Sequence, residues 1–413
     1  MRVRRPTGED QQAELGGALA KDIVTLMKSQ LSLRSIGGAL ALALLAVPAT
    51  AQVVQPFVSG LRAPIKLLAL PDSQLLVAEA GDGPNTGRVS FVDRDGRRST
   101  IIDGLPSGFG GPGNAEPSGP SALLQIGRRL FVVIGGGDVA IETTVAIPNP
   151  SVSSPLFSSV LLLEFPDSVG DFGFDFALPA SAHAAIAAGQ GVYLRNTRGE
   201  SVRVSRLADF PDFVAEPTAA EPRNVRLSNP FSIVGSNAGI AVVDASFNRI
   251  WTVAITPTLG APIALANFAP VPNTVPGLGP PVVEAVPASI REVGNDYLVS
   301  LLTGFPFGPG AASVWRVNRF TGATERVLSG LQTAIDVLPI TGTSDQFYVL
   351  EYSRAFLTNG PGRLIRVDGT RGTSLVLADP LQNATSLALD TRTGDLFVIE
   401  RRANRIVKVL VPK

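Results

Sequence analysis

The 413-residue sequence has no cysteine and only one histidine, His183. Without cysteine neither disulfides nor thiolate metal ligands are available, so the fold must be held together by packing alone. A single histidine also leaves little scope for imidazole-based acid–base chemistry. His183 stands in the Ala-rich stretch "PASAHAAIAAG", and we expect it to be an exposed surface residue without a catalytic role.

An excess of charge of one sign is also lacking. Lysine plus arginine and aspartate plus glutamate each number 35, and no basic stripe runs along the chain. Nucleic acid and anionic membranes are attracted by basic surface, so neither is an expected partner. No second long apolar run follows the one near the N-terminus, and we therefore expect no stable membrane anchor in the mature protein.

The one apolar run, 36–47, follows a positively charged segment that begins at Met27. It is followed by the small-x-small sequence Ala-Thr-Ala, which ends at Ala51. This pattern predicts a secretory signal peptide that starts at Met27, with a buried helix as the alternative. We therefore interpret 1–51 as an N-terminal extension plus signal peptide, and 52–413 as a mature periplasmic or extracellular domain.

Glycine (42 residues) and proline (33 residues) are abundant, although apolar residues still make up 45% of the chain. This composition is typical of an ordered, turn-rich protein with many short strands. Similar segments recur every 40 to 50 residues or so, as propeller blades do. Six copies can be aligned, at 63–105, from 119, from 229, at 287–331, at 333–381 and at 384–411.

Each copy predicts four strands, of which the second is almost entirely apolar ("LLVAEA", "LFVIER") because blades pack face to face. The last copy stops after its third strand, and "VVQPFVSGL" at 53–61 resembles the fourth strand of other copies. We predict an all-β, six-bladed β-propeller of four-stranded antiparallel blades, closed by pairing this N-terminal strand with the last blade. An irregular insertion near 166–228 interrupts the repeat.

A hairpin pattern is repeated within the blades: "VVDASFNRI" at 242–250 returns as "VIERRANRI" at 398–406. In each, a carboxylate ends the second strand and an arginine begins the third. A hairpin brings these two positions together, so an ion pair within each blade is the simplest interpretation. The expected pairs are Glu79 with Arg88, Asp244 with Arg249, Glu351 with Arg363 and Glu400 with Arg405.

The hairpin pattern resembles the NHL-type propeller repeat. The longer segments "LLVAEAG", "GRVSFVDRDG", "SNPF" and above all "LTGFPFGPGAASVWRV" resemble the ScyD/ScyE family of exported bacterial propeller proteins, over essentially all of 53–411. The resemblance implies an exported propeller. It implies no enzymatic activity, because the family has no established one to carry over.

Two functions from different classes remain open. The first is a non-enzymatic binding or scaffold module, with exposed aromatic loops on a rigid scaffold. The alternative is a metal-dependent hydrolase of the lactonase type that uses carboxylates at the propeller rim, where oxygen ligands suit calcium. No nucleophile motif, catalytic residue or cofactor is predicted, and calcium is the one ion considered.

The candidate ligand-binding residues lie where second strands end and in the loops that follow. Their expected ligand is a protein, a glycan or a small molecule, and the expected oligomeric state is a monomer. The candidates are Glu79, Asp244, Glu351, Glu400, Phe305, Phe307 and Asn229.

Overall fold

A computed structural model of the chain describes residues 54–166, 173–236, 239–255, 260–369 and 371–411. The chain divides into two units, Met1–Ala51 and Gln52–Lys413. The first unit lies outside the described residues, and with it the expected signal peptide and its start at Met27. Everything that follows concerns the second unit.

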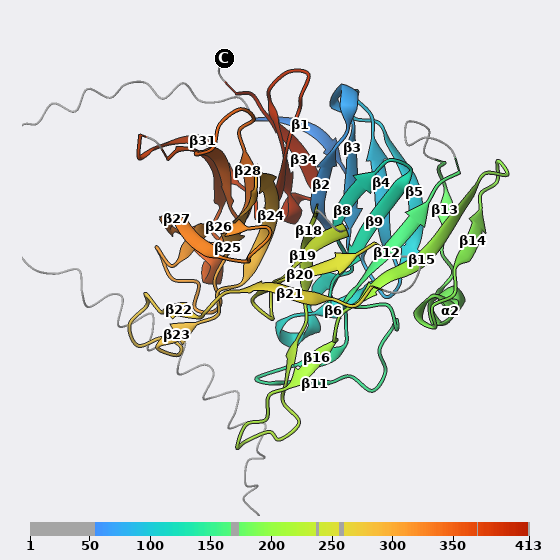
Figure 1. Cartoon of the computed structure of the whole chain (residues 1–413), viewed down its shortest axis with the longest axis horizontal. Helices are drawn as coiled ribbons and strands as arrows, with labels where there is room; N and C mark the ends of the chain where they lie inside the picture. The colour runs from blue at the N-terminus through green and yellow to red at the C-terminus, as the bar shows by residue number, and fades with distance from the viewer. Residues whose placement is uncertain (1–53, 167–172, 237–238, 256–259, 370, 412–413) are drawn as a thin grey trace, which may run out of the picture. The chain divides into compact units, whose positions relative to one another are not determined.

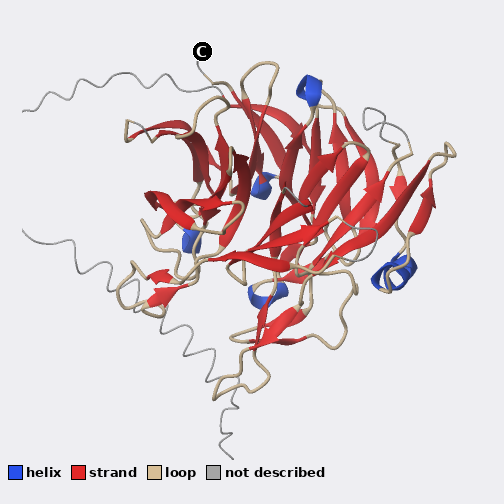
Figure 2. Ribbon diagram, in the orientation of Figure 1, coloured by secondary structure: helices blue, strands red, loops and turns tan. Residues whose placement is uncertain are grey.

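This unit is a six-bladed β-propeller, as the repeat predicts (Figures 1 and 2). The first strands of successive blades contact one another around the ring and surround the propeller axis, so we call them inner strands. In each blade the strands follow one another outward. Blade 1 has β2 (Pro64–Ala69), β3 (Leu75–Glu79), β4 (Gly87–Val92) and β5 (Arg98–Leu105); blade 2 has β8 (Pro120–Ile126), β9 (Arg129–Ile134), β12 (Ser159–Glu164) and β15 (Ser201–Asp209); blade 3 has β18 (Pro230–Gly235), β19 (Gly239–Asp244), β20 (Arg249–Ala254) and β21 (Ile263–Asn267).

The second half of the chain repeats the arrangement with fewer decorations. Blade 4 has β24 (Pro287–Val293), β25 (Asp296–Leu301), β26 (Ala312–Asn318) and β27 (Thr324–Leu331); blade 5 has β28 (Ala334–Pro339), β29 (Gln346–Glu351), β30 (Gly362–Asp368) and β31 (Thr373–Leu381); blade 6 has β32 (Ala384–Leu389), β33 (Leu396–Glu400), β34 (Arg405–Val409) and β1 (Val54–Ser59).

The ring closes through β1, as the sequence predicts. This first strand pairs antiparallel with β34, from Val54 opposite Val409 to Ser59 opposite Arg405. The ring of Phe57 lies 4.7 Å from that of Phe397, between their centroids. Blade 6 is thus completed by both ends of the described chain, which leaves no unpaired β34 edge.

Blades 1 and 2 have five strands, so the expectation of four strands in every blade is wrong for these two. The insertion near 166–228 supplies the fourth strand of blade 2, β15, and both extra strands. β13 (Phe176–Ala177) pairs parallel with β5, and β14 (Val192–Arg195) pairs antiparallel with β15. Between them come η3 (Ala180–Ala182) and α2 (His183–Ala187).

His183 is buried, with only 1% of its surface exposed, so the expectation of an exposed histidine is wrong. It lies on the face of α2 that also buries Ile186. Its Nε2–H donates to the carbonyl of Gly104 (3.1 Å), which leaves Nδ1 to accept from the hydroxyl of Ser154 (2.9 Å). Burial lowers the pKa of His183, although the bond to Gly104 opposes this. His183 therefore fastens α2 to β5 of blade 1 and to the segment that precedes β12 of blade 2.

The core consists of six apolar clusters among the described residues, one between each pair of neighbouring blades. The second strand of each blade is buried over nearly its whole length, which explains its continuous apolar sequence. Blades 6 and 1 are joined in the same way as the rest, through Phe397 and Ile399 packed with Leu67 and Val77.

Strand direction alternates within a blade, so two kinds of connection emerge on one rim: from second to third strand, and from outermost strand to the next blade. We call it the loop-bearing rim. Figure 1 shows its hairpins gathered along the lower side of the view. They are β6 (Gly108–Gly110) with β7 (Glu116–Ser118), β10 (Ala140–Glu142) with β11 (Ala146–Pro148), β16 (Phe213–Ala215) with β17 (Val225–Leu227), and β22 (Val271–Pro272) with β23 (Val282–Val283).

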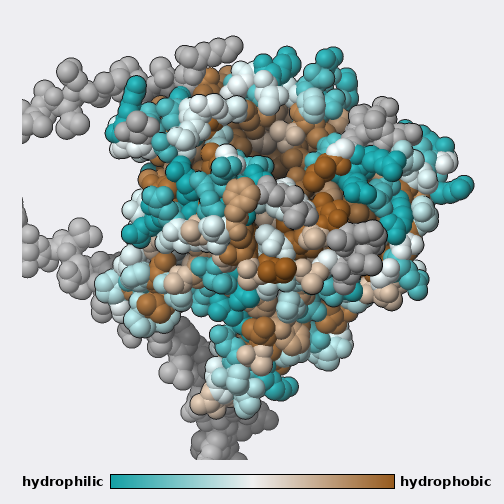
Figure 3. All heavy atoms as spheres, in the orientation of Figure 1, coloured by the Kyte–Doolittle hydropathy of each residue, from teal (hydrophilic) through white to brown (hydrophobic). Residues whose placement is uncertain are grey.

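Short 3-10 turns complete the described secondary structure: η1 (Pro71–Ser73), η2 (Pro112–Asn114), η4 (Phe356–Thr358) and η5 (Arg401–Ala403). Over the visible face, hydrophilic and hydrophobic residues interleave (Figure 3). Within the described ranges, no helix is both long and apolar enough to cross a membrane.

Candidate functional site

The four candidate carboxylates do not converge on one another. Each is buried, with at most 2% of its surface exposed, at the end of the second strand of its blade. Each accepts a backbone N–H from the segment that leads into the inner strand of the same blade. The donors are Arg62 for Glu79 (2.5 Å), Asn229 for Asp244 (3.0 Å), Gln332 for Glu351 (2.6 Å) and Gln382 for Glu400 (2.8 Å).

In all four blades the carboxylate and the arginine lie directly opposite each other on neighbouring strands, as predicted. An ion pair forms in three of them. Glu79 is 3.3 Å from the guanidinium of Arg88, Glu400 is 2.5 Å from that of Arg405, and Glu351 pairs with Arg363. These carboxylates therefore tie the start of each blade to its second hairpin, which is a structural task.

Asp244 is the exception, and its expected ion pair with Arg249 is wrong, since no salt bridge joins the two among the described residues. Asp244 instead accepts from the hydroxyl of Ser228 (2.7 Å), the backbone of Phe247 (3.0 Å) and the indole of Trp251 (3.4 Å). The Arg249 guanidinium lies 4.8 Å from the centroid of the Trp251 ring. An aspartate is one methylene shorter than a glutamate. The Asp244 carboxylate therefore accepts hydrogen bonds from nearby donors of its own turn, and Arg249 stacks on Trp251 instead of pairing with it.

The asparagines of the repeated hairpin are also equivalent in structure. Asn248 and Asn404 both have positive φ, 53° and 50°, as expected of a tight turn that asparagine tolerates. Asn248 Oδ1 accepts the N–H of Val286 (2.8 Å), and Asn404 Oδ1 accepts that of Ala63 (3.2 Å). Each acceptor thus fixes the residue that precedes the inner strand of the following blade.

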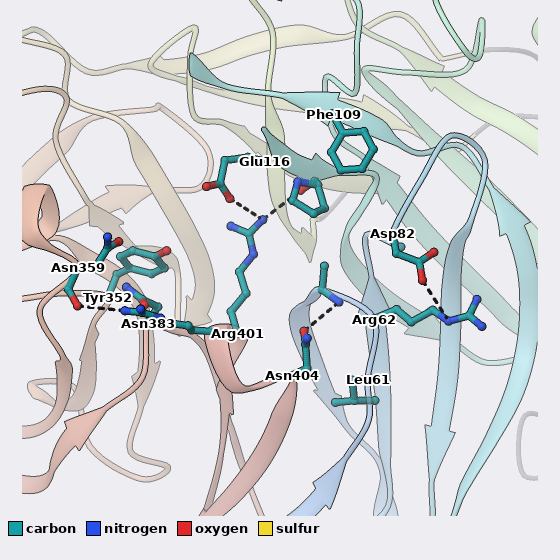
Figure 4. A pocket seen from close by; sticks show the side chains of 14 residues that line it. Leu61, Arg62, Asp82, Phe109, Glu116, Tyr352, Asn359, Asn383, Arg401 and Asn404 are labelled. Atoms are coloured by element: carbon teal, nitrogen blue, oxygen red, sulfur yellow. Dashed lines mark hydrogen bonds and ion pairs between the residues drawn. The ribbon is translucent and has the colours of Figure 1, made fainter. Parts of the chain in front are cut away.

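A basin on the loop-bearing rim lies beside these hairpins. Its first pocket, of about 550 Å³, collects side chains from blades 1, 5 and 6 and from the β6–β7 hairpin. In Figure 4 the Arg401 side chain reaches across it toward Glu116 (3.2 Å) and the carbonyl of Pro117 (3.1 Å). Three guanidiniums, three amides and two aromatic rings line this pocket: Arg62, Arg401, Arg402, Asn359, Asn383, Asn404, Tyr352 and Phe109.

A second pocket of about 430 Å³ adjoins the first and shares Glu116, Pro117 and Arg401 with it. We call the two together the rim basin. Two of the sequence candidates, Asn229 and Phe307, line the second pocket.

The remaining candidate aromatics pack on one another. Phe307 stacks on Phe356, with ring centroids 3.8 Å apart, and Tyr352 lies 5.4 Å from Phe356. Phe305 meets Phe307 edge to face at 6.5 Å and is 49% exposed. This aromatic cluster joins the loops of blades 4 and 5 and borders the basin at Phe307 and Tyr352. Burial raises the pKa of Tyr352, so its hydroxyl stays protonated, although Arg401 opposes the shift.

The charges of the first pocket do not cancel. Arg62 pairs with Asp82 (3.8 Å) and Arg401 with Glu116. Among the described residues no carboxylate pairs with Arg402, whose one hydrogen bond is a long one to the carbonyl of Asn359 (3.5 Å). No group of three or more His, Cys, Asp or Glu in the described part of the chain is placed to hold a metal ion. What the basin offers a ligand is therefore an unpaired guanidinium, amides and aromatic faces.

A second polar feature, which the sequence analysis missed, surrounds the propeller axis. Each inner strand has a bulge after its first residue, and the residue that resumes pairing is equivalent in all six blades. We call these six residues the axial ring. They are Lys66, Ala122, Ser232, Ser289, Asp336 and Ser386. Aligning the inner strands "PIKLL", "PASIR" and "AIDVL" by their bulges is the signal that could have found them.

Comparisons with known proteins add little to this geometry. No protein-family model matches the chain, and no curated protein does. Among solved structures, a candidate 6-phosphogluconolactonase from Bacteroides uniformis has 12% identity and a TM-score of 0.41, over 83% of this chain and 79% of that one. An auxiliary nutrient binding protein from Bacteroides thetaiotaomicron has 10% identity and a TM-score of 0.44, over 86% and 75%.

Proposed function

We propose that this chain is an exported, ScyD/ScyE-like propeller that acts as a non-enzymatic binding module, with its ligand in the rim basin. The observation that carries the proposal is the unpaired Arg402 among the amides and aromatic rings of the first pocket. A guanidinium recognises a carboxylate by paired hydrogen bonds. Amides bind hydroxyls, and an aromatic face packs on the apolar side of a sugar ring.

The ligand class that fits this set is an acidic carbohydrate, such as a uronic acid. Three arginines against Asp82 and Glu116 leave the first pocket with a net charge of +1, which favours one carboxylate. The aromatic cluster and the β6–β7 hairpin flank the basin.

The hydrolase alternative requires oxygen ligands that are free and converge. Glu79, Asp244, Glu351 and Glu400 are instead occupied by backbone N–H groups of their own blades and, in three cases, by arginine. No specific observation favours metal-assisted hydrolysis over binding.

The test is a thermal melt of purified residues 52–413 with uronic acids and their oligomers, each beside its neutral analogue. Binding to the folded state raises the melting temperature by mass action. We expect the acidic sugars alone to do so, and Arg402→Ala to weaken their binding about tenfold or more. The matched control is Arg371→Ala, an exposed arginine at the β30–β31 turn on the opposite rim.

Two results would contradict the proposal. One is equal stabilisation by neutral and acidic sugars, or by neither, and the other is unchanged binding in Arg402→Ala. A parallel melt with EDTA and with added calcium examines the alternative. A rise with calcium that disappears in Glu351→Gln would favour the hydrolase.

A further inference from the structure

The axial ring contains one buried cation that lacks enough acceptors. Lys66 is 3% exposed, and its ammonium Nζ forms an ion pair with Asp336 Oδ2 at 3.5 Å, without a close hydrogen bond. Nζ also lies 5.4 Å from the centroid of the Phe231 ring, which lines the second pocket of the rim basin. An ammonium has three N–H donors. Within the described residues, none of those of Lys66 has a hydrogen-bond acceptor.

Asp336 cannot satisfy Lys66, because its two oxygens are already occupied. They accept the hydroxyls of Ser289 (2.5 Å) and Ser386 (3.1 Å) and the backbone N–H of Leu387 (3.1 Å). Arg291 Nη2 adds a charge-assisted pair at 3.0 and 3.2 Å. Asp336 is thus the anchor of blades 4, 5 and 6 at the axis, and Arg291 is the cation that balances its charge.

The axis therefore has a surplus positive charge. Lys66 and Arg291 against Asp336 give a net charge of +1, and of these three side chains only that of Arg291, 22% exposed, reaches water. The four other members of the axial ring, Ala122, Ser232, Ser289 and Ser386, are uncharged, so none of them supplies a second counter-ion to the ammonium. A buried ammonium without hydrogen-bond acceptors is costly, so an anion that supplies them would complete this site.

We propose that a small monovalent anion, with the chemistry of chloride, binds at the Lys66 ammonium within the axial ring. The ion supplies the acceptor that Asp336 cannot and neutralises the surplus charge. The site is distinct from the rim basin and does not depend on the function proposed for it. Its task is to hold blade 1 against the opposite side of the ring.

The titration of Lys66 supports this assignment. Burial lowers its pKa to about 8, although Asp336 opposes the shift. The charged groups that face Lys66 are Asp336 on β28 and Arg291 on β24, and the ring residues on β8, β18 and β32 are uncharged. A bound anion favours the charged form of Lys66. The anion should therefore bind tightly below about pH 8 and be released as Lys66 loses its proton above it.

The experiment compares the melting temperature of residues 52–413 in sodium chloride and in sodium gluconate, at constant ionic strength and pH 7. Gluconate is a much larger anion than chloride. We expect a saturable rise of about 2 °C or more with chloride. Lys66→Met, which keeps the length of the side chain and removes its charge, should abolish the rise. Lys408→Met and Arg402→Ala should both keep it, since neither residue belongs to the axial ring.

A direct measurement keeps the proposal testable even if Lys66→Met does not fold. Crystals of the wild-type domain grown in sodium bromide should show an anomalous peak within hydrogen-bond distance of Lys66 Nζ. The proposal is overturned if the axis shows no such peak, if chloride and gluconate give equal melting temperatures, or if the chloride effect persists in Lys66→Met.

Discussion

Blades 3 and 6 have the same hairpin, yet the hairpin is stabilised differently in each. In blade 6, Glu400 binds Arg405 and one backbone N–H. In blade 3, Asp244 binds four donors and no cation, and Arg249 stacks on Trp251 instead. The shared part is the asparagine, which in both blades fixes the start of the following blade.

The comparison teaches that the repeated motif encodes a connection between blades and leaves the local charge pairing free to vary. One methylene decides whether a carboxylate reaches the opposite arginine or folds back onto its own turn. The two blades also differ in origin, because blade 3 is contiguous in sequence whereas blade 6 takes its outermost strand from the N-terminus.

The largest difference between the two blades should appear when β1 is removed. Deleting residues 52–59 leaves β34 unpaired and Phe397 without Phe57. We expect a loss of about 3–6 kcal/mol in the free energy of unfolding, measured by urea denaturation, because the ring opens and apolar surface is exposed. Blade 3 takes all four strands from one continuous stretch of the chain, so a short terminal deletion removes none of them.

A peptide of residues 52–61, added in trans, is the control for this deletion. It should restore the melting temperature in proportion to its concentration, since it supplies the missing strand by main-chain pairing. An unchanged stability in the truncated protein would show that β1 does not seal the ring.

A smaller difference should follow from neutralising the two carboxylates. Asp244→Asn replaces one acceptor oxygen with an amide NH2 group, which then faces buried donors. We expect a loss of about 2–4 kcal/mol in the free energy of unfolding. Glu400→Gln keeps the acceptor for Gln382, and Arg405, 33% exposed at its side chain, can turn to water. The loss there should be about 1 kcal/mol. Equal losses in urea denaturation would contradict the idea that the number of donors sets the difference between the two hairpins.

The smallest expected effect is a loss of stability at low pH, and it arises at the turn between the first and second strands. In blade 6 this turn has Asp390, and in blade 3 the equivalent residue is Ser236. Burial alone would raise the pKa of Asp390, but hydrogen bonds from Lys408 (2.9 Å), Ser73 (2.8 Å) and Thr393 bring it down to about 2. The stability that Asp390 contributes is therefore complete above about pH 4 and is lost as the pH falls through 2.

We expect Asp390→Asn to lose about 1–2 kcal/mol at pH 7 and to converge with the wild type near pH 2, measured by urea denaturation across that range. Ser236→Ala in blade 3 is the matched control, and its effect should not vary with pH because no titratable side chain is removed. A constant deficit in Asp390→Asn from pH 7 to pH 2 would contradict the assigned pKa.

Much of the fold could be predicted because it depends on patterns within single segments. The continuous apolar second strands, such as "LFVIE", identify six blades, and the likeness of 53–61 to an outermost strand identifies the closure. The turn conformation of Asn404 follows in the same way, since asparagine tolerates positive φ wherever it stands.

The candidate site was less predictable, because its contacts join segments far apart in the chain. Asn229 and Phe307 do line the basin, but Arg401 and Arg402 acquire their place only when blade 6 meets the β6–β7 hairpin. His183 was misjudged because an Ala-rich helix gives no periodic sign of which face is buried. Lys66 and Asp336 were missed because no local pattern says which inner strands face each other across the axis.

The pairing of β1 with β34 also sets an order of events during synthesis. A ribosome releases β1 first and β34 last, so nearly the whole domain must emerge before the ring can be sealed. Until then the growing protein presents one bare strand and, on each newest blade, an apolar face without a neighbour. The time spent in that open state, which lengthens with such distant pairings, is when this protein is most exposed to aggregation and most in need of a chaperone.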